Sequence, residues 1–235
     1  MDPVTPAARV WPRPFTSRLT RQEAVLVLAY LPVHLLGLQL LFSYLLNRGL
    51  VTSAMANLLY YLIGFLYMVL AAFPFLRRDF DALIDAPFSC IREIARSYLA
   101  MMCFNLLLGL LFTLLPESEN PNNASIMSAV EQDGRTMRAA LIYLTPVVEE
   151  MLFRAGIFGA IRQKSRAAAY LVSALCFSLY HVAVYAFFEP LYWLFLLQYI
   201  PVSLLLARCY ERTNSIWCSI FFHMLVNGIS LSVAA

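Results

Sequence analysis

The chain is built from long, uninterrupted runs of apolar residues, and these runs decide which folds are open to it. Each run has about the 20 residues that a helix needs to cross roughly 30 Å of hydrocarbon. Because apolar residues do not alternate with polar ones, the runs indicate helices and not the strands of a membrane β-barrel. The predicted spans, in an all-α, polytopic transmembrane helical bundle, are 24–46, 54–76, 98–115, 139–161, 167–188, 191–207 and 214–233.

Composition excludes a water-soluble domain. Hydrophobic residues make up 61% and charged residues only 13% of the 235 residues, against about 25% charged residues in soluble domains. The net charge of +3 gives no nucleic-acid signal, because the arginines are scattered between apolar runs and form no basic stripe. The five cysteines form no CxxC pair and indicate buried free thiols. We expect a lipid bilayer and no nucleic acid around this chain.

The cations alternate between the two ends of the predicted spans. Lysine and arginine number 13 in the N-terminal segment and in the second, fourth and sixth connections, but only 3 in the other connections. The positive-inside rule then places the N-terminus in the cytoplasm of an integral, multi-pass protein, in the plasma membrane if the host is bacterial. No cleavable signal peptide is expected, because the first apolar run is too long for one.

Two connections stand out by their composition. In 77–97, apolar residues recur at near-helical spacing among charges, which predicts a helix in the cytoplasmic interface, broken near Pro87; if it dips into the membrane, the spans number eight. Segment 116–138 is polar, and we expect a flexible outer loop. The predicted organisation is a cytoplasmic segment 1–23, a unit 24–138 with N-terminal spans, interfacial helix and outer loop, and a membrane core 139–235.

One predicted span carries three ionisable residues, Glu149, Glu150 and Arg154. A charge at the centre of a spanning helix costs roughly 2.5 to 3.5 kcal/mol, so its presence calls for a functional hypothesis. Glu150 and Arg154 are four residues apart and share a helical face, where they can neutralise each other. Glu149 points about 100° away and has no partner in its own helix.

Two later spans bring further polar groups to the same depth, His181 in 167–188 and the pair His223 and Asn227 in 214–233. With about 1.5 Å of rise per residue, Glu149 and these three lie roughly 14 to 21 Å from the cytoplasmic ends of their spans. The sequence therefore predicts a polar cavity among the fourth, fifth and seventh spans.

These residue types fit the hydrolysis of a peptide bond. A carboxylate withdrawn from bulk water, such as Glu149, is a competent general base for water. His181 can share that water or protonate the departing amine. His223 and Asn227 lie one helical turn apart and can donate hydrogen bonds to an oxyanion, where one donor is typically worth about 3 kcal/mol.

Three motifs in this order, Glu149-Glu150-x-x-x-Arg154, Phe177-x-x-x-His181 and His223-x-x-x-Asn227, resemble those of the CAAX protease and bacteriocin-processing (CPBP) family. The resemblance covers about 139–230. It implies an intramembrane glutamic endopeptidase of CAAX type, with a catalytic core in 139–235 and a peptide, peptide-precursor or membrane-protein substrate, prenylated or not. The residues it assigns are Glu149 and His181 to water, His223 and Asn227 to the oxyanion, and Glu150, Arg154 and Phe177 to their support.

Other interpretations stay open on sequence alone. A zinc ion on Glu149, His181 and His223 is an alternative, but there is no His-Glu-x-x-His spacing and Arg154 would oppose a dication; we expect no cofactor to be required. The resemblance also leaves open a non-catalytic membrane scaffold or a bacteriocin-immunity protein of the same fold, and a buried Glu pair suits a proton-coupled transporter. The substrate and the oligomeric state do not follow from the sequence.

Overall fold

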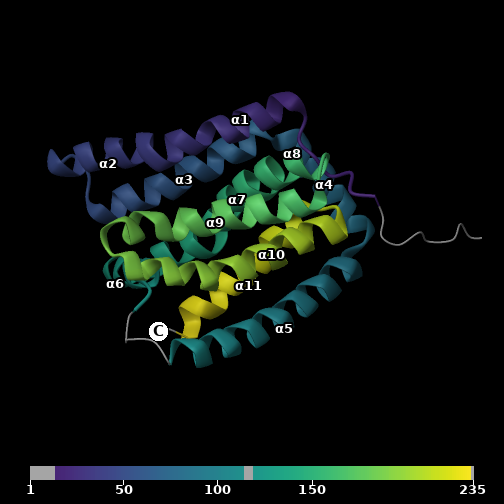
Figure 1. Ribbon diagram of the computed structural model, residues 1–235. Helices are drawn as coiled ribbons and strands as arrows, with labels where there is room; N and C mark the ends of the chain where they lie inside the picture. Colours follow the sequence, from purple (N-terminus) through teal and green to yellow (C-terminus); the bar gives the residue numbers. More distant parts are fainter. Residues whose placement is uncertain (1–13, 114–118, 234–235) are drawn as a thin grey trace, which may run out of the picture.

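The computed structural model describes residues 14–113 and 119–233, and over these residues the chain is a bundle of helices without strands (Figure 1). The first hairpin consists of a long bent helix and its return helix. Its elements are α1 (Arg21–Pro32), the π-helical turn η1 (Val33–Gly37), α2 (Leu38–Asn47) and α3 (Ser53–Ala71).

The remaining elements form the rest of the bundle around a central, irregular helix. After the first hairpin come α4 (Phe73–Asp85), α5 (Pro87–Phe112) and α6 (Pro121–Ala139). The central helix follows α6 without a break as η2 (Ala140–Leu144), α7 (Thr145–Glu150), η3 (Met151–Phe158) and α8 (Gly159–Arg162). The last elements are α9 (Arg166–Phe188), the 3₁₀ turn η4 (Pro190–Phe195), α10 (Leu196–Thr213) and α11 (Ile216–Val233).

Among the described residues, six helices are long and apolar enough to cross a membrane, and each overlaps a predicted span. They are Arg21–Asn47, Ser53–Ala71, Pro87–Phe112, Arg166–Phe188, Pro190–Thr213 and Ile216–Val233. The seventh prediction, 139–161, is helical but carries three charged residues. Every residue from 146 to 156 is buried, so this helix lies inside the bundle. Charged side chains are tolerated in a membrane when they face protein in this way.

The outer surface of the bundle is apolar. Leu40 on α2, Leu70 on α3 and Leu106 on α5 are 70%, 78% and 67% exposed. Large apolar side chains exposed over several helices are stable in contact with lipid hydrocarbon but unfavourable in contact with water. All five cysteines are free; Cys90, Cys209 and Cys218 are buried, whereas Cys103 is exposed, contrary to the expected burial.

The expectation of a flexible outer loop over 116–138 is wrong for its described residues, because α6 occupies Pro121–Ala139. The Asn120 side chain caps this helix by accepting from the backbone N–H of Asn122, and Pro121 opens its first turn. Val130 and Met137 are buried and give the helix an apolar face. The many polar residues of the segment hide this face in a simple count, and only Gly134, with a φ of 61°, departs from helical geometry.

The break predicted near Pro87 is confirmed, but only the first half of 77–97 is a separate helix. α4 ends at Asp85, and its 13 residues extend only about 20 Å, too short for an eighth span. The second half belongs to α5, which runs for 26 residues into the following span. Proline at the first position of a helix needs no hydrogen-bonded N–H, so Pro87 starts α5, and the break separates α4 from this longer helix instead of dividing one interfacial helix.

The described parts of the four cation-rich segments, which begin at residue 14 in the first of them, meet at one end of the bundle, on the right in Figure 1. The Asn214 side chain donates to the carbonyl of Pro14 at 3.0 Å, and the Arg78 guanidinium donates to the carbonyl of Arg18 at 2.7 Å. Arg162 is paired with Glu211. The fold therefore agrees with the alternation of charge that the sequence shows, while the assignment of this end to the cytoplasm stays a prediction.

Candidate active site

The two adjacent carboxylates lie where the central helix changes its winding. α7 ends at Glu150, and the π-helical segment η3 begins at Met151. π-helical turns inside α-helices occur frequently at functional sites. Upstream, Pro146 follows the π-helical turn η2, so the pair is flanked on both sides by irregular helix.

Glu149 faces two histidines from two other helices. Its Oε2 lies 3.7 Å from Nε2 of His181 on α9 and 3.7 Å from Nε2 of His223 on α11. This oxygen is buried and has no hydrogen-bond partner among the residues that the structure describes. An unpartnered buried carboxylate oxygen calls for an explanation, and the two distances leave room for a small donor between the three atoms.

His181 is oriented by its own motif. Its Nδ1 lies 2.9 Å from the backbone carbonyl of Phe177, one turn earlier, and its ring packs against the Phe177 ring at 4.5 Å. On the other face, the Tyr199 ring is stacked on it at 4.5 Å and 19°. A carbonyl oxygen only accepts hydrogen bonds, so Nδ1 carries the proton and Nε2 of the neutral ring is an acceptor directed at Glu149.

His223 is oriented by Glu150. Its Nδ1 lies 2.8 Å from Glu150 Oε1, and Ser219, one turn earlier on α11, donates to Glu150 Oε2 at 2.5 Å. Because Glu150 is also ion-paired with a guanidinium, Nδ1 of His223 is the donor to a carboxylate. The same reasoning then makes Nε2 of a neutral His223 an acceptor, which becomes a donor when the ring is protonated.

Arg154 holds Glu150 from the same helix, as the four-residue spacing predicts. Its Nη1 lies 3.3 Å from Glu150 Oε1, with both side chains fully buried. Nη2 donates to the Ser203 hydroxyl at 3.1 Å and to its carbonyl at 3.3 Å. The guanidinium also lies 4.2 Å from the centre of the Phe177 ring, a cation–π contact. Phe177 thus touches both the Arg154 charge and the His181 ring.

Asn227 has a partner that the sequence does not reveal. Its Nδ2 donates to the backbone carbonyl of Leu141 at 3.0 Å. In η2 the N–H of Thr145 bonds to Ala140, five residues earlier, so the next bond in this register would come from Pro146, which has no N–H. Asn227 therefore satisfies a carbonyl that Pro146 leaves free, and one N–H of its amide remains for another acceptor.

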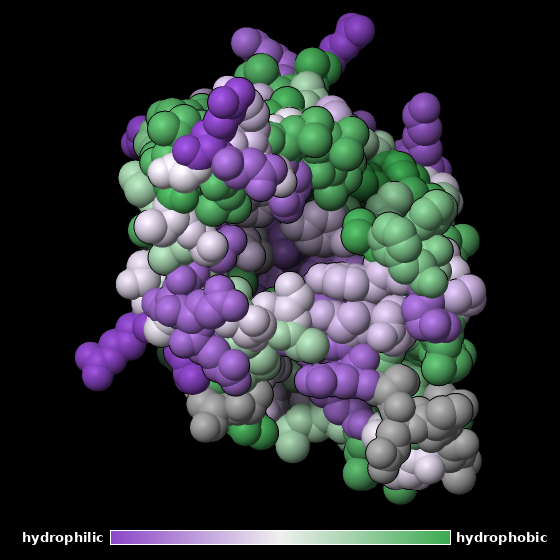
Figure 2. All heavy atoms as spheres, turned by 90° about the vertical axis from the view of Figure 1, so that its left-hand side faces the viewer, coloured by the Kyte–Doolittle hydropathy of each residue, from purple (hydrophilic) through white to green (hydrophobic). Residues whose placement is uncertain are grey.

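A cavity of about 260 Å³ connects these groups. Four residues predicted for the site, Glu149, His181, His223 and Asn227, line it together with Phe177. Its other walls come from α5, α6 and α10, so it extends beyond the three predicted spans. Figure 2 views the end of the bundle opposite the cation-rich segments, and this face is hollowed at its centre, with hydrophilic residues around the hollow.

Several residues of the site were missed by sequence reasoning. Tyr199 stacks on His181, Ser203 binds Arg154 and Ser219 binds Glu150. Only Ser219 has a local signal, because it precedes His223 by four residues and shares its helical face. As to metal, no group of three or more His, Cys, Asp or Glu side chains within 14–113 and 119–233 is arranged to hold an ion; zinc on Glu149, His181 and His223 stays an alternative to a site that works without metal.

Comparison with known proteins finds a family and a curated relative to which part of the chain is similar. Residues 135–229 match the family described as Type II CAAX prenyl endopeptidase Rce1-like. The chain is also 29% identical over 110 residues to the "Putative membrane peptidase YdiL" of Bacillus subtilis (strain 168), an alignment that covers 46% of this chain and 41% of the relative. It thus spans about two fifths of the length of this curated relative. No solved structure matches the chain significantly. The resemblance to the CAAX protease family that the three motifs indicate is therefore confirmed for residues 135–229.

Proposed function

We propose that this protein is an intramembrane endopeptidase in which Glu149 and two histidines activate water for the hydrolysis of a peptide bond. One observation carries the proposal: the Nε2 atoms of His181 and His223 both lie 3.7 Å from an unpartnered Glu149 oxygen. The family match to a prenyl endopeptidase supports the same class of reaction.

The protonation pattern favours water at this point. With both Nδ1 atoms engaged as donors, Glu149 Oε2 and the two neutral Nε2 atoms present three acceptors to one another. Three acceptors cannot bond among themselves, but a water molecule can donate to two of them. Such a water keeps its lone pairs free for attack on a carbonyl carbon.

The reaction then needs only groups of this chain and water. Glu149 takes one proton from the water as its oxygen bonds to the scissile carbonyl carbon. When the tetrahedral intermediate collapses, the C–N bond breaks and the departing amine takes that proton from Glu149. The second water proton stays on the new carboxyl group until it leaves. His181, fixed by Phe177 and Tyr199, holds the water in line during the attack.

Charge on the carbonyl oxygen has two stabilising groups in this arrangement. His223, held by Glu150 at 2.8 Å from Nδ1, donates to that oxygen from Nε2 after its ring has taken a proton from solvent on substrate entry, and it returns this proton when the intermediate has collapsed; the attacking water then donates to Glu149 and His181. The second N–H of the Asn227 amide is the other donor. Glu150, Arg154 and Phe177 touch no reacting atom and act as positioning residues.

The substrate is proposed as a membrane-associated peptide, of prenylated CAAX type or a peptide precursor. The cavity wall combines amide and hydroxyl groups, as in Gln198 and Tyr199, with apolar side chains such as Met101, Ile126 and Leu231. Amide groups suit a peptide backbone, and apolar side chains suit a lipid-like or hydrophobic side group.

Purified protein in liposomes tests the proposal. The wild type is incubated with a farnesylated CAAX peptide and with a set of hydrophobic precursor peptides, and products are identified by mass spectrometry. We expect cleavage that Glu149→Ala and His181→Ala reduce by at least about a hundredfold, while Glu131→Gln, which changes an exposed carboxylate on α6, keeps wild-type turnover. Cleavage at the wild-type rate by Glu149→Ala would reject the assignment.

Three further measurements distinguish the alternatives, two on the purified protein and one in cells. Elemental analysis and chelators test for zinc: activity lost with a chelator and restored by zinc would replace the metal-free mechanism. A scaffold would act in cells equally well as the wild type or as Glu149→Ala. A transporter would show solute uptake driven by a proton gradient and dependent on Glu149.

A further inference from the structure

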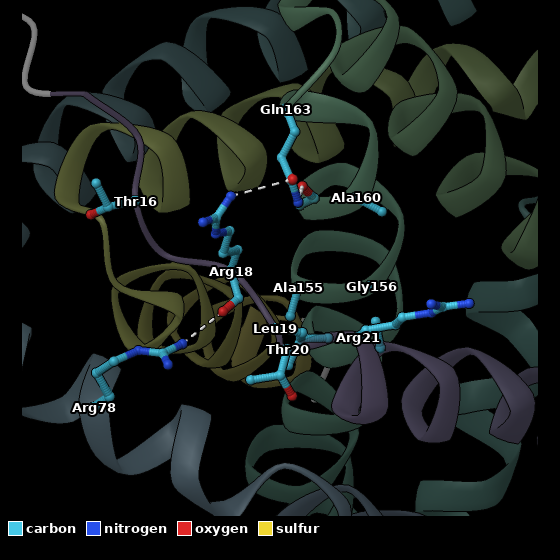
Figure 3. Close-up of a pocket in the computed structure, with 12 residues that line it drawn as sticks. Thr16, Arg18, Leu19, Thr20, Arg21, Arg78, Ala155, Gly156, Ala160 and Gln163 are labelled. Atoms are coloured by element: carbon cyan, nitrogen blue, oxygen red, sulfur yellow. Dashed lines mark hydrogen bonds between the residues drawn. The ribbon is translucent and has the colours of Figure 1, made fainter.

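A second cavity lies at the cation-rich end of the bundle and is not used by the proposed reaction. Its volume is about 600 Å³, against about 260 Å³ for the candidate active site. The walls come from residues 16–24, from Arg78 on α4 and from the end of the central helix (Figure 3). These are segments from three of the four cation-rich parts of the sequence.

Three arginine residues contribute to the walls of this cavity. Arg18, Arg21 and Arg78 line it and are exposed. Figure 3 shows Arg18 reaching toward Gln163, Arg78 directed at the Arg18 backbone, and Arg21 extending on the other side. The polar contacts are those of Arg18 Nη1 with the Gln163 side chain at 3.4 Å and of Arg78 Nη2 with the Arg18 carbonyl at 2.7 Å.

None of the three guanidinium groups has a carboxylate within 4.0 Å among the described residues. By contrast, Arg162 and Arg166 at the same end of the bundle are both ion-paired with Glu211. The nearby acids Glu23 and Asp79 are buried and already accept hydrogen bonds. Glu23 accepts from Phe75 and Thr20, and Asp79 accepts from Ile216 and Ser17. The cavity therefore carries uncompensated positive charge.

The floor of the cavity is apolar and lacks large side chains. It is formed by Ala155, Gly156, Gly159 and Ala160 of the central helix, facing Leu19 and Ala24. Gly156 is packed tightly against α1, because an added Cβ would lie 2.9 Å from Leu28 Cδ2. Small residues over this stretch leave volume that carbon atoms can fill, next to cations that attract an anion.

We propose that this cavity binds the phosphate group of an anionic membrane lipid, with the glycerol and the first acyl carbons against the Ala and Gly floor. Guanidinium groups bind phosphate oxygens through charge-assisted, often bidentate, hydrogen bonds. Basic pockets among helices at the cytoplasmic side of a membrane lie at the level of lipid headgroups, and this is the end to which the charge pattern assigns the cytoplasm. The proposal is independent of the proteolytic activity.

Lipid binding to the purified full-length protein in detergent tests this site. Short-chain phosphatidylglycerol is titrated against thermal unfolding, with phosphatidylcholine and inorganic phosphate as separate arms. We expect phosphatidylglycerol to raise the unfolding temperature at saturation, and Arg78→Gln to weaken its apparent affinity about fivefold, the effect of one cation near an anionic surface. Arg77→Gln is the matched control, since Arg77 is exposed on the same helix and does not line the cavity.

A second variant fills the space and keeps the charge. Ala160→Trp places a large ring in the cavity from an exposed position and should weaken phosphatidylglycerol binding at least as much as Arg78→Gln. Equal stabilisation by inorganic phosphate would assign the site to a soluble phosphate and overturn the lipid as its ligand. Wild-type affinity for phosphatidylglycerol in both Arg78→Gln and Ala160→Trp would overturn the site itself.

Discussion

The adjacent carboxylates Glu149 and Glu150 should respond in opposite ways to the same substitution. Glu150 is fully buried, is ion-paired with Arg154 and accepts from His223 and Ser219. Glu150→Gln leaves the Arg154 charge buried without compensation, and removing one partner of a buried pair costs about 3–5 kcal/mol. We expect this variant to lose that much of its free energy of unfolding.

Glu149→Gln removes a charge that no arginine or lysine within 14–113 and 119–233 neutralises by direct contact. The Glu149 side chain is 5% exposed and its Oε2 has no partner. The amide of the variant would supply N–H donors to the two histidine acceptors that face it, in place of a carboxylate oxygen that cannot donate. We expect a free energy of unfolding that is unchanged or higher by about 1–2 kcal/mol, together with loss of cleavage by about a hundredfold or more.

Both quantities can be measured on one preparation, by thermal or denaturant unfolding in detergent and by peptide cleavage in liposomes. Activity alone does not separate the two residues, because Glu150→Gln also disturbs His223. Stability does separate them. If Glu149→Gln destabilises the protein as much as Glu150→Gln, the two carboxylates have the same structural role and the reasoning from their contacts is refuted. Glu131→Gln on the exposed face of α6 serves as the reference.

Three further predictions rest on other parts of the molecule. Burial raises the pKa of Asp79 from 3.8 to about 6, so between these pH values the folded state binds more protons than the unfolded state. The free energy of unfolding should therefore fall by about 3 kcal/mol as pH rises from 4 to above 6. Asp79→Asn should remove this part of the pH dependence of unfolding. Gly156→Val should lower the free energy of unfolding by about 1–3 kcal/mol, because a Cβ at this position would lie 2.9 Å from a leucine of α1. Gly109→Val, where an added Cβ meets open space, should change the free energy of unfolding far less. Equal losses in the two variants would contradict the close helix contact. Asn227→Ala should lower both turnover and, by about 1–3 kcal/mol, the free energy of unfolding, because it leaves the Leu141 carbonyl without its donor. If the variant lost turnover but kept wild-type stability, Asn227 would act on the oxyanion alone.

The sequence determined six of the spans and the motif residues that line the cavity. Apolar runs of about 20 residues predict spanning helices because hydrocarbon thickness fixes their length. The spacing of four residues predicts the contact of Glu150 with Arg154, which the structure confirms at 3.3 Å, because helix geometry brings such positions together. The depth of Glu149, His181 and His223 follows from the rise per residue in the same way.

Tertiary structure decided the contacts between helices and the state of each polar atom. That Tyr199 stacks on His181, that Asn227 replaces the missing Pro146 donor and that Arg18 and Arg78 border one cavity depends on how helices far apart in the chain pack. The helix α6 was not predicted, for the same reason. Val130 and Met137 are buried by contacts with other helices, and the sequence of the segment does not show which helices these are. Periodicity fixes what lies one turn away along a helix, whereas packing alone fixes what lies across from it.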